Sequence, residues 1–203
     1  MRKAISYYDS YNFTLYDLIS DAQKVLDIGC AEGKLGEQLK LRKNCFVAGV
    51  EIDENLAMLA KERYDKVIIG DIENLSELPF PDRFFDAIIF GDVLEHLKNP
   101  EAVLLQIKRY LQDDGFIAMS IPNVAFLMVR MKLLLGKFDY AEEGILDRTH
   151  LRFYTLKTLK SMVSRCGYKI VLIKVRTPRW YLSKLANLWK GLLAYEFVIM
   201  AKK

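Results

Sequence analysis

Short apolar runs and amphipathic segments alternate along most of the chain. Apolar runs bounded by polar or glycine-containing turns are typical of buried strands, whereas apolar positions three or four residues apart indicate helices. The predicted strands are Lys24–Ile28, Phe46–Glu51, Lys66–Ile69, Phe85–Phe90, Gly115–Ser120, Tyr168–Val175 and Glu196–Ala201, and the predicted helices are Phe13–Ser20, Lys34–Lys40, Asn55–Tyr64, Asn99–Leu111 and Leu156–Arg165. We therefore predict an α/β, Rossmann-like, doubly wound sheet with a ligand crevice at the carboxyl ends of its strands.

Three segments depart from this alternation. Residues 1–20 form a predicted helical cap, in which Tyr7, Tyr8 and Tyr11 would either pack on the domain or cover a bound ligand. Residues 123–149 begin with an apolar stretch and continue as a polar loop, which we interpret as a lid. Residues 176–194 contain WYLSKLANLWKGLL, whose spacing predicts an amphipathic, cationic helix. That helix would either cross over the sheet between the last two strands or lie on anionic lipid.

The length of 203 residues fits one domain spanning residues 1–203. The amino-terminal residues contain no apolar core of signal-peptide length, and no uncharged apolar run is long enough to span a membrane. Cys30, Cys45 and Cys166 are widely separated and lack a C-x-x-C pairing, which argues against a disulfide framework and a structural zinc site. We expect a cytoplasmic protein with free thiols.

Charge is distributed unevenly along the chain, which carries 30 Lys and Arg against 26 Asp and Glu. From Leu151 onward, twelve basic residues are accompanied by the single acid Glu196. This basic third is either a solvated surface or a face that meets an anion, such as a phosphate-bearing substrate, a membrane surface or nucleic acid.

The turn after the first predicted strand points to a nucleoside site. The run VLDIGCAEGKL begins at Val25 and leads from a strand through Gly29 and Gly33 into a helix. The following strand closes on Glu51, about 20 residues beyond the first glycine. Nucleoside-binding α/β folds place there the carboxylate that holds the ribose hydroxyls.

The details of this turn argue against a dinucleotide. The G-x-G-x-x-G spacing needs glycines where this chain has Ala31 and Lys34. Asp27 before the turn and Glu32 within it would repel a phosphate. S-adenosylmethionine fits better, because it carries a sulfonium, an ammonium and a ribose with two free hydroxyls, but no phosphate.

Five segments occur in the order of the motifs of class I S-adenosylmethionine-dependent methyltransferases, which the chain resembles from about Asp21 to Lys203. They read VLDIGCAEG, GVEID, GDIENLSELPF, FDAIIFGDVLEHL and LQDDGFIAMSIPN. The resemblance implies S-adenosylmethionine as methyl donor, S-adenosylhomocysteine as product and a last strand antiparallel to the rest. Ala31 is a departure, because the family more often has glycine there, and we expect it only to tighten the turn.

The family's binding roles carry over to the matching positions of this chain. The resemblance implies that the turn after the first strand frames the methionyl moiety, that the end of the second strand holds the ribose, and that later loops meet the adenine and the methionyl amino group. The expected cofactor-binding residues are, in that order, Asp27, Gly29 and Gly33 with the neighbouring Cys30; Glu51 with the neighbouring Ile52; Asp71 and Ile72; and Gly91 and Asp92.

Both histidines of the chain fall in segments that the fold would bring to the rim of the crevice. An imidazole titrates near neutrality, which suits removal of a proton from a hydroxyl acceptor. We favour His150 as the catalytic base and hold His96 as the second candidate. The alternative for His150 is a structural role at the entry of the next helix, although Thr155 can cap that helix alone.

A metal site built from Glu95, His96, Asp147 and His150 is not expected. Carboxylates and imidazoles together suit divalent ions. However, Glu95 and His96 are adjacent and would point in different directions on a helix, and no H-x-x-x-H spacing supports them.

The favoured function is methyl transfer to a hydroxyl of a sugar or similar metabolite. The segment GILDRTHLRFYTLKTLKSMVSRCGY also resembles methyltransferases found beside glycosyltransferases of bacterial surface-polysaccharide pathways. The acceptor would be anionic or lipid-linked if the basic third meets it, with peripheral membrane contact. Nitrogen or carbon methylation, including quinone-like substrates, and a non-catalytic, cofactor-binding regulator are the alternatives. Nucleic acid is disfavoured, because the chain has no N-P-P-Y motif.

Overall fold

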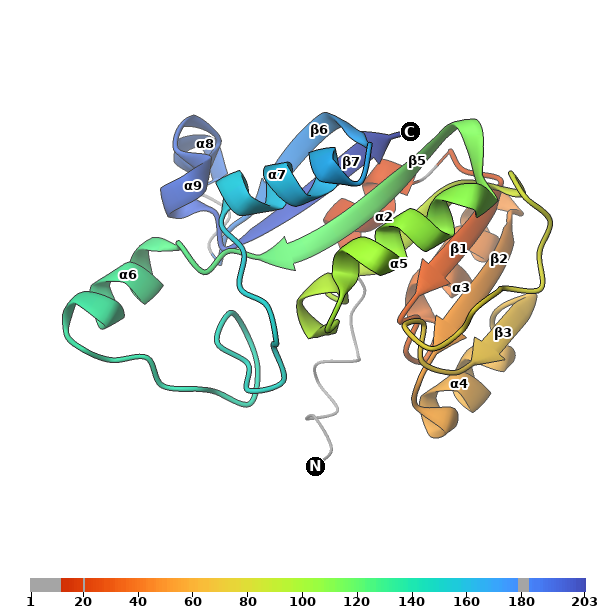
Figure 1. Ribbon diagram of the computed structural model, residues 1–203, viewed down its shortest axis with the longest axis horizontal. Helices are drawn as coiled ribbons and strands as arrows, with labels where there is room; N and C mark the ends of the chain where they lie inside the picture. Colours follow the sequence, from red (N-terminus) through yellow and green to blue (C-terminus); the bar gives the residue numbers. More distant parts are fainter. Residues whose placement is uncertain (1–11, 20, 179–182) are drawn as a thin grey trace.

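The computed structural model describes residues 12–19, 21–178 and 183–203, and its centre is a seven-stranded sheet with strand order β3-β2-β1-β4-β5-β7-β6 (Figure 1). Every pairing from β3 to β5 is parallel, whereas β7 is antiparallel to both β5 and β6. The strands are β1 (Lys24–Ile28), β2 (Phe46–Glu51), β3 (Lys66–Ile69), β4 (Phe85–Gly91), β5 (Leu111–Pro122), β6 (Lys169–Arg176) and β7 (Glu196–Lys202). The predicted Rossmann-like fold with an antiparallel last strand is confirmed.

Helices cover both faces of this sheet (Figure 1). On one face lie α5 and α7, and on the other α2, α3 and α4 contribute buried residues. The helices are α2 (Phe13–Ile19), α3 (Lys34–Lys43), α4 (Glu54–Lys61), α5 (Pro100–Ile107), α6 (Leu127–Leu134), α7 (Leu156–Arg165), α8 (Ser183–Leu188) and α9 (Lys190–Leu193), with 3-10 turns η1 (Leu94–His96) and η2 (Lys108–Tyr110).

The central strands divide their side chains between two cores. In β4, Ile88 and Phe90 pack with α5 and α7, whereas Ala87 and Ile89 pack with α2 and α3. Because successive strand residues point to opposite faces, a continuous apolar run is what a strand covered on both faces requires. The uniform burial of these strands fixes the positions of their carboxyl ends, where the crevice lies.

The two largest differences between predicted and observed element boundaries lie on either side of η2. The helix predicted to reach Leu111 stops at Ile107, and β5 then starts at Leu111, before the predicted Gly115. The predicted cap at Thr155 is present: its hydroxyl accepts from the backbone N–H of Thr158 as part of a capping box.

The amphipathic helix predicted within residues 176–194 is divided. Residues 179–182 lie outside the described part of the chain, as do Tyr7, Tyr8 and Tyr11. The remainder forms α8 and α9, separated at Trp189. Ala186 is fully buried, but the side chains of Leu188 and Trp189 are 87% and 67% exposed. Packing on the sheet therefore does not account for Leu188 and Trp189.

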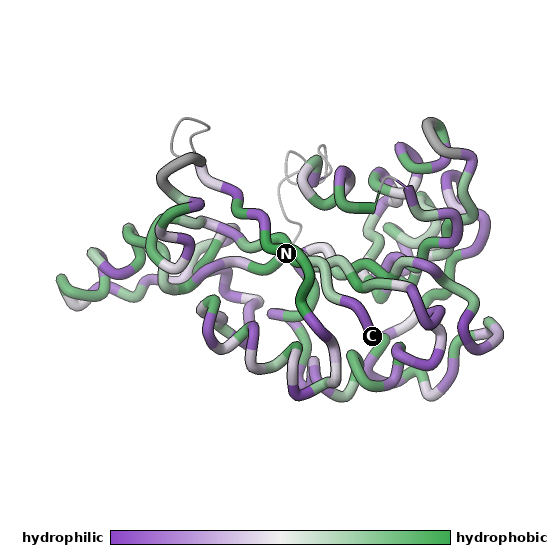
Figure 2. The backbone as a smooth tube through the Cα atoms, turned by 90° about the horizontal axis from the view of Figure 1, so that it is seen from above, coloured by the Kyte–Doolittle hydropathy of each residue, from purple (hydrophilic) through white to green (hydrophobic). Residues whose placement is uncertain are grey.

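The segment 123–149 stands away from the sheet and exposes much of its apolar surface. Figures 1 and 2 show α6 at one extreme of the molecule, and in Figure 1 a short link joins it to β5 and a long loop leads from it to α7. The side chains of Leu134 and Leu135 are 80% and 72% exposed. Val129 of α6 packs with Ile145 and Leu146 in a small cluster. None of the helices in the described residues has the length and apolarity needed to cross a membrane.

Candidate active site

A cavity of about 910 Å³ opens at the carboxyl ends of β1, β2 and β4. All but one of the ten expected cofactor-binding residues line this cavity: Asp27, Gly29, Cys30, Glu51, Ile52, Asp71, Ile72, Gly91 and Asp92. The exception is Gly33, where a Cβ would lie 2.9 Å from the ring of Tyr64 and 3.1 Å from the Cα of Ala60. Gly33 therefore shapes the turn from behind by letting α3 approach α4.

Gly29 is positioned by both its backbone and its surroundings. Its φ is 71°, in the left-handed region that favours glycine, and its N–H donates to the carbonyl of Val50 over 2.8 Å. A Cβ at this position would lie 2.5 Å from Cγ2 of Val93. The glycine thus allows the end of β1 to lie against the start of η1, where Val93 lines the cavity.

Ala31 also adopts a left-handed conformation, with φ of 47°. This conformation costs an alanine roughly 1–2 kcal/mol, which goes beyond the expected tightening of the turn. In this conformation the N–H of Ala31 donates to Oε2 of Glu51 over 2.8 Å. The strain and this hydrogen bond therefore occur together at the point where β1 and β2 meet the cavity.

The Glu51 carboxylate is fixed by two backbone donors and still faces the cavity. Oε1 accepts from the N–H of Asp53 over 2.9 Å, and Oε2 accepts from that of Ala31. A carboxylate has about four acceptor positions, so the fixed group retains capacity for ligand hydroxyls. The side chain is 7% exposed. This arrangement suits a pair of ribose hydroxyls.

Asp27 is a buried acid in the wall of the cavity. Burial, with a smaller contribution from the charge of Glu51, raises the pKa of Asp27 to about 7, although the hydrogen bond from Tyr64 lowers it. The Tyr64 hydroxyl donates to Oδ2 of Asp27 over 2.7 Å and accepts from the N–H of Gly36 over 3.0 Å. A cation bound nearby would favour ionised Asp27. Tyr64 was not expected at this site, because a tyrosine near the end of a predicted helix gives no signal of a contact with Asp27.

Asp71 and Asp92 organise the loops on the other walls. Oδ1 of Asp71 accepts from the N–H of Glu73 over 2.9 Å, which closes a turn around the buried Ile72. Asp92 has φ of 54°, and its N–H donates to Oγ of Ser120, whose hydroxyl donates back to Oδ1 of Asp92, each over 3.0 Å. These bonds join the end of β4 to β5 at the cavity edge.

Cys30 contributes a neutral wall. Burial, followed by the charges of Asp27 and Glu51, raises the pKa of its thiol. A protonated thiol is a poor nucleophile and a poor metal ligand. The cysteine therefore lines the cavity as a neutral thiol.

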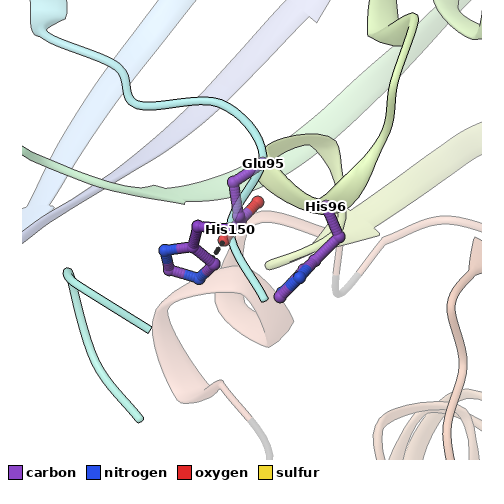
Figure 3. A group of neighbouring side chains, drawn as sticks. All are labelled: Glu95, His96 and His150. Atoms are coloured by element: carbon purple, nitrogen blue, oxygen red, sulfur yellow. Dashed lines mark ion pairs between the residues drawn. The ribbon is translucent and has the colours of Figure 1, made fainter. Parts of the chain in front are cut away.

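Glu95, His96 and His150 come together beside this cavity, contrary to the expectation that Glu95 and His96 point apart (Figure 3). One potential ligand atom from each lies within 4.8 Å of the other two. The backbone carbonyl of Glu95 accepts from the N–H groups of Leu151 and Arg152, over 2.8 and 3.0 Å, which fixes η1 against the loop that carries His150. Asp147, the fourth residue considered, is outside this group.

The two imidazoles occupy different depths. His96 lines the cavity, whereas His150 does not, and its side chain is only 6% exposed. Their ring centroids are 4.8 Å apart in an edge-to-face arrangement. Nε2 of His150 lies 4.0 Å from Oε1 of Glu95. His96, the second candidate of the sequence analysis, is therefore the imidazole that faces the crevice.

A hydrogen-bonded group of Asn12, Arg176 and Glu196, which was not expected from the sequence, lies at the edge of the cavity. Arg176 and Asn12 line the cavity, and both contact Glu196 of β7: Nη1 of Arg176 over 2.6 Å and Nδ2 of Asn12 over 2.8 Å. Burial and the charge of Asp92 raise the pKa of Glu196 to about 8 despite these partners. Only the position of Glu196 as the lone acid of the basic third could have drawn attention to it.

Comparisons with known proteins agree with this geometry. A family model for the methyltransferase domain matches residues 6–173. An uncharacterised protein of Methanocaldococcus jannaschii is 30% identical over 169 residues, which cover 75% of this chain and 64% of that protein. A probable S-adenosylmethionine-dependent methyltransferase of Mycobacterium tuberculosis is 33% identical over 102 residues, which cover 50% of this chain and 36% of that protein. The chain thus spans less than two thirds of the length of either relative.

The fold is also that of solved structures. The crystal structure of an S-adenosylmethionine-dependent methyltransferase from Archaeoglobus fulgidus superposes with a TM-score of 0.67 at 20% identity, over 98% of this chain and 97% of that one. At this identity the likeness shows the fold alone. The family match, which covers most of the residues that build the cavity, shows that the chain belongs to the family of methyltransferase domains.

Proposed function

We propose that the chain is an S-adenosylmethionine-dependent methyltransferase that methylates a hydroxyl oxygen of a small molecule. The observation that carries the choice of oxygen is His96, an imidazole in the wall of the same cavity that Asp27 and Glu51 line. A hydroxyl must lose its proton as it is methylated, and a positioned imidazole is the side chain best suited to accept that proton.

Different residues of the cavity would bind different parts of S-adenosylmethionine. S-adenosylmethionine, when bound, supplies a methyl group on a sulfonium that leaves as a neutral sulfide. Glu51 is placed to accept from the ribose hydroxyls, and Asp27 to oppose the positive charges of the ligand. Gly29 keeps the wall open beside Val93. Alignment of donor and acceptor within one cavity accounts for most of the catalysis such a reaction needs.

His96 has a defined basic nitrogen. The hydroxyl of Thr149 donates to Oδ1 of Asp147 over 2.6 Å, and its oxygen therefore accepts from Nδ1 of His96, 3.2 Å away. The carbonyl of Thr149 lies 3.2 Å from the same Nδ1. With Nδ1 as donor, Nε2 carries the lone pair in the neutral ring. We assign proton acceptance to Nε2 of His96 and a positioning role to His150 behind it.

The test is transfer of a labelled methyl group to a panel of hydroxyl, amine and carbon acceptors, including sugars and phenols. We expect label on oxygen, and His96→Asn should lower kcat by about 10²- to 10⁴-fold. S-adenosylhomocysteine should still bind this variant with unchanged affinity. Label on nitrogen or carbon would contradict the choice of oxygen. Tight binding of the donor without transfer to any acceptor would favour the regulatory alternative.

The exposed apolar surface around α6 favours an acceptor held at a membrane. Residues 124–138 contain Arg130, Lys132 and Lys137 and no acid, among apolar side chains that include the exposed Leu134 and Leu135. An apolar face with cations is the composition that binds the interface of anionic lipid. A lipid-linked hydroxyl compound would thus reach the cavity from this side. The resemblance of residues 144–168 to surface-polysaccharide methyltransferases agrees with a sugar on such a lipid.

Vesicle flotation at low salt tests this second part of the proposal. The protein should float with phosphatidylglycerol vesicles and remain behind with phosphatidylcholine vesicles. The double substitution L134D/L135D should abolish flotation. The matched control is Leu41→Asp, because Leu41 is 73% exposed on α3, away from α6. Equal flotation of all three proteins, or none by the wild type, would contradict a membrane role for α6.

A further inference from the structure

Three side chains with metal-binding atoms converge at the rim of the cavity. Glu95 and His96 come from η1, and His150 comes from the loop before α7 (Figure 3). Glu95 is 1% exposed and the His150 side chain 6% exposed. A buried carboxylate needs a cationic partner, and beside these two imidazoles either a protonated ring or a bound metal ion supplies one.

Both imidazoles are oriented by hydrogen bonds at Nδ1. Nδ1 of His150 lies 3.1 Å from the carbonyl of Ile145, which only accepts, so this nitrogen carries the proton. Nδ1 of His96 is likewise the donor to Thr149, as described above. Nε2 is then the lone-pair nitrogen in both rings. Metal-binding histidines are held in the same way, with the second ring N–H donated to a carbonyl, a carboxylate or water.

We propose that Glu95, His96 and His150 bind a divalent transition metal, with Zn²⁺ as the reference ion. Two imidazole nitrogens and one carboxylate form a donor set that suits Zn²⁺ and other first-row ions. Three protein ligands leave a coordination position open. Because His96 lines the cavity, that position faces the space where an acceptor would lie.

The present distances require only a small closure. Neighbouring ligands of a tetrahedral ion with bonds of about 2.0–2.2 Å lie roughly 3.3–3.6 Å apart. The Nε2–Oε1 distance between His150 and Glu95 is 4.0 Å, and one ring nitrogen of His96 lies within 4.8 Å of a potential ligand atom of each of the other two residues. Each side chain needs to move by about 1 Å or less, while the backbone bonds from Leu151 and Arg152 to Glu95 stay in place.

In the proposed methyl transfer, the metal would activate the acceptor hydroxyl. This role rests on the proposed function. A hydroxyl bound at the open position has a lowered pKa and releases its proton to water. The oxygen lone pair then forms the O–C bond, and the C–S electron pair stays on sulfur. With metal bound, the imidazole of His96 is a ligand, and the metal performs the activation that His96 performs alone in the metal-free protein.

Nuclear magnetic resonance of the wild-type chain tests metal binding without any variant. The chain has only two histidines, so long-range proton–nitrogen spectra of the imidazoles contain two ring systems. One equivalent of ZnCl₂ should shift Nε2 of both rings and saturate. Shifts of one ring alone, or none up to millimolar Zn²⁺, would overturn the proposal.

Calorimetric titration with ZnCl₂ then assigns the third ligand. We expect one ion per chain, and Glu95→Gln, His96→Asn and His150→Asn should each weaken binding at least tenfold. The matched control is Glu143→Gln, because Glu143 lines the same cavity but lies outside the group. This control should bind Zn²⁺ like the wild type. Equal weakening in the control, or undiminished binding by Glu95→Gln, would contradict the assignment.

The two proposals can fail separately. Zinc binding is measured without donor or acceptor, so saturable binding with methyl transfer only to nitrogen would refute oxygen methylation and leave the metal site intact. Oxygen methylation that persists unchanged in the presence of a chelator, together with the absence of zinc binding, would refute the metal site and leave the proposed function intact.

Discussion

The two walls of the crevice are built in opposite ways. On one side, the carboxylates of Asp27 and Glu51 are buried, and that of Glu51 is fixed by two backbone hydrogen bonds. On the other side, the segment 123–149 exposes apolar side chains and packs through only a small cluster. The difference indicates that the first wall is shaped for one ligand, whereas the second is free to vary with the acceptor.

A Cβ atom added at Gly29 or at Gly136 would meet very different surroundings, which illustrates the difference between the two walls. Both have φ of 71°, so both backbones favour glycine. A Cβ at Gly29 would lie 2.5 Å from Val93, whereas a Cβ at Gly136 would have no atom within 4 Å. The same substitution therefore separates backbone strain from crowding.

Gly29→Ala should have the largest effect of the substitutions considered. Backbone strain of roughly 1–2 kcal/mol and crowding of about 1–3 kcal/mol should lower the free energy of unfolding by about 3 kcal/mol. Displacement of Val93 should also weaken S-adenosylmethionine binding more than tenfold. Gly136→Ala should cost about 1 kcal/mol and leave that affinity unchanged. Urea denaturation and calorimetry measure both; equal losses in the two variants would show that crowding at Gly29 is unimportant.

Glu51→Gln should weaken binding of S-adenosylmethionine by about 10- to 100-fold. Hydrogen bonds to a charged acceptor contribute about 1.5–3 kcal/mol, and an amide offers one acceptor where the carboxylate offers two. Glu143→Gln, on the opposite wall of the same cavity, should change the affinity less than twofold. Calorimetric titration of both variants decides. Equal affinities in the two variants would remove Glu51 from the proposed ribose site.

The pH dependence of donor binding should follow Asp27. With a pKa of about 7, this carboxyl is mostly protonated at pH 6 and mostly ionised at pH 8. A cationic ligand prefers the ionised form, so the affinity for S-adenosylmethionine should rise by up to about tenfold over this interval. Asp27→Asn should show a flat profile at low affinity. A wild-type profile as flat as that of the variant would contradict a contact between Asp27 and the ligand's charge.

Rising pH should increase the affinity for the ligand through Asp27, but in the ligand-free protein the same carboxyl should lower the free energy of unfolding as pH rises. Its folded pKa of about 7 exceeds the value near 3.9 in an unfolded chain, so the folded state binds more protons between these pH values. The contribution of Asp27 to the free energy of unfolding should therefore fall as pH rises from about 4 to 7. Urea titrations of the wild type and Asp27→Asn at both ends of this range measure that difference.

Leu134→Ala should have the smallest effect on stability. The side chain is 80% exposed, so its truncation removes little buried area and should change the free energy of unfolding by less than about 0.5 kcal/mol. Thermal or urea denaturation measures this value. A loss above about 1 kcal/mol would mean that α6 packs on another surface in solution and that the contrast between the two walls is overstated.

Much of the cofactor side could be predicted from the sequence because its signals are local. The apolar run before Gly29, the acid at Glu51 and the residues of each loop lie in short motifs that also lie together in space. The antiparallel last strand came from the resemblance, and the structure confirms it. Gly33 was grouped with the cavity because a turn pattern cannot tell which of its glycines faces the ligand and which faces α4.

The group of Glu95, His96 and His150 was considered from the sequence but rejected, because Glu95 and His96 were expected to point apart on a helix. Glu95 and His96 lie in a single 3-10 turn, where side-chain directions differ from those of an α-helix. The loop that carries His150 is held beside them by hydrogen bonds from the N–H groups of Leu151 and Arg152 to the carbonyl of Glu95, which no residue type in the sequence indicates. The same holds for Tyr64 and Arg176, whose partners are distant in sequence.

The position of β7 between β5 and β6 has a consequence for biosynthesis. Within the described sheet, β6 pairs with β7 alone, so β6 leaves the ribosome before its partner exists. Until the last strand emerges, both β5 and β6 offer unpaired edges that can associate with other chains. Expression conditions that slow aggregation of nascent chains, such as low temperature or abundant chaperones, should therefore raise the yield of folded protein.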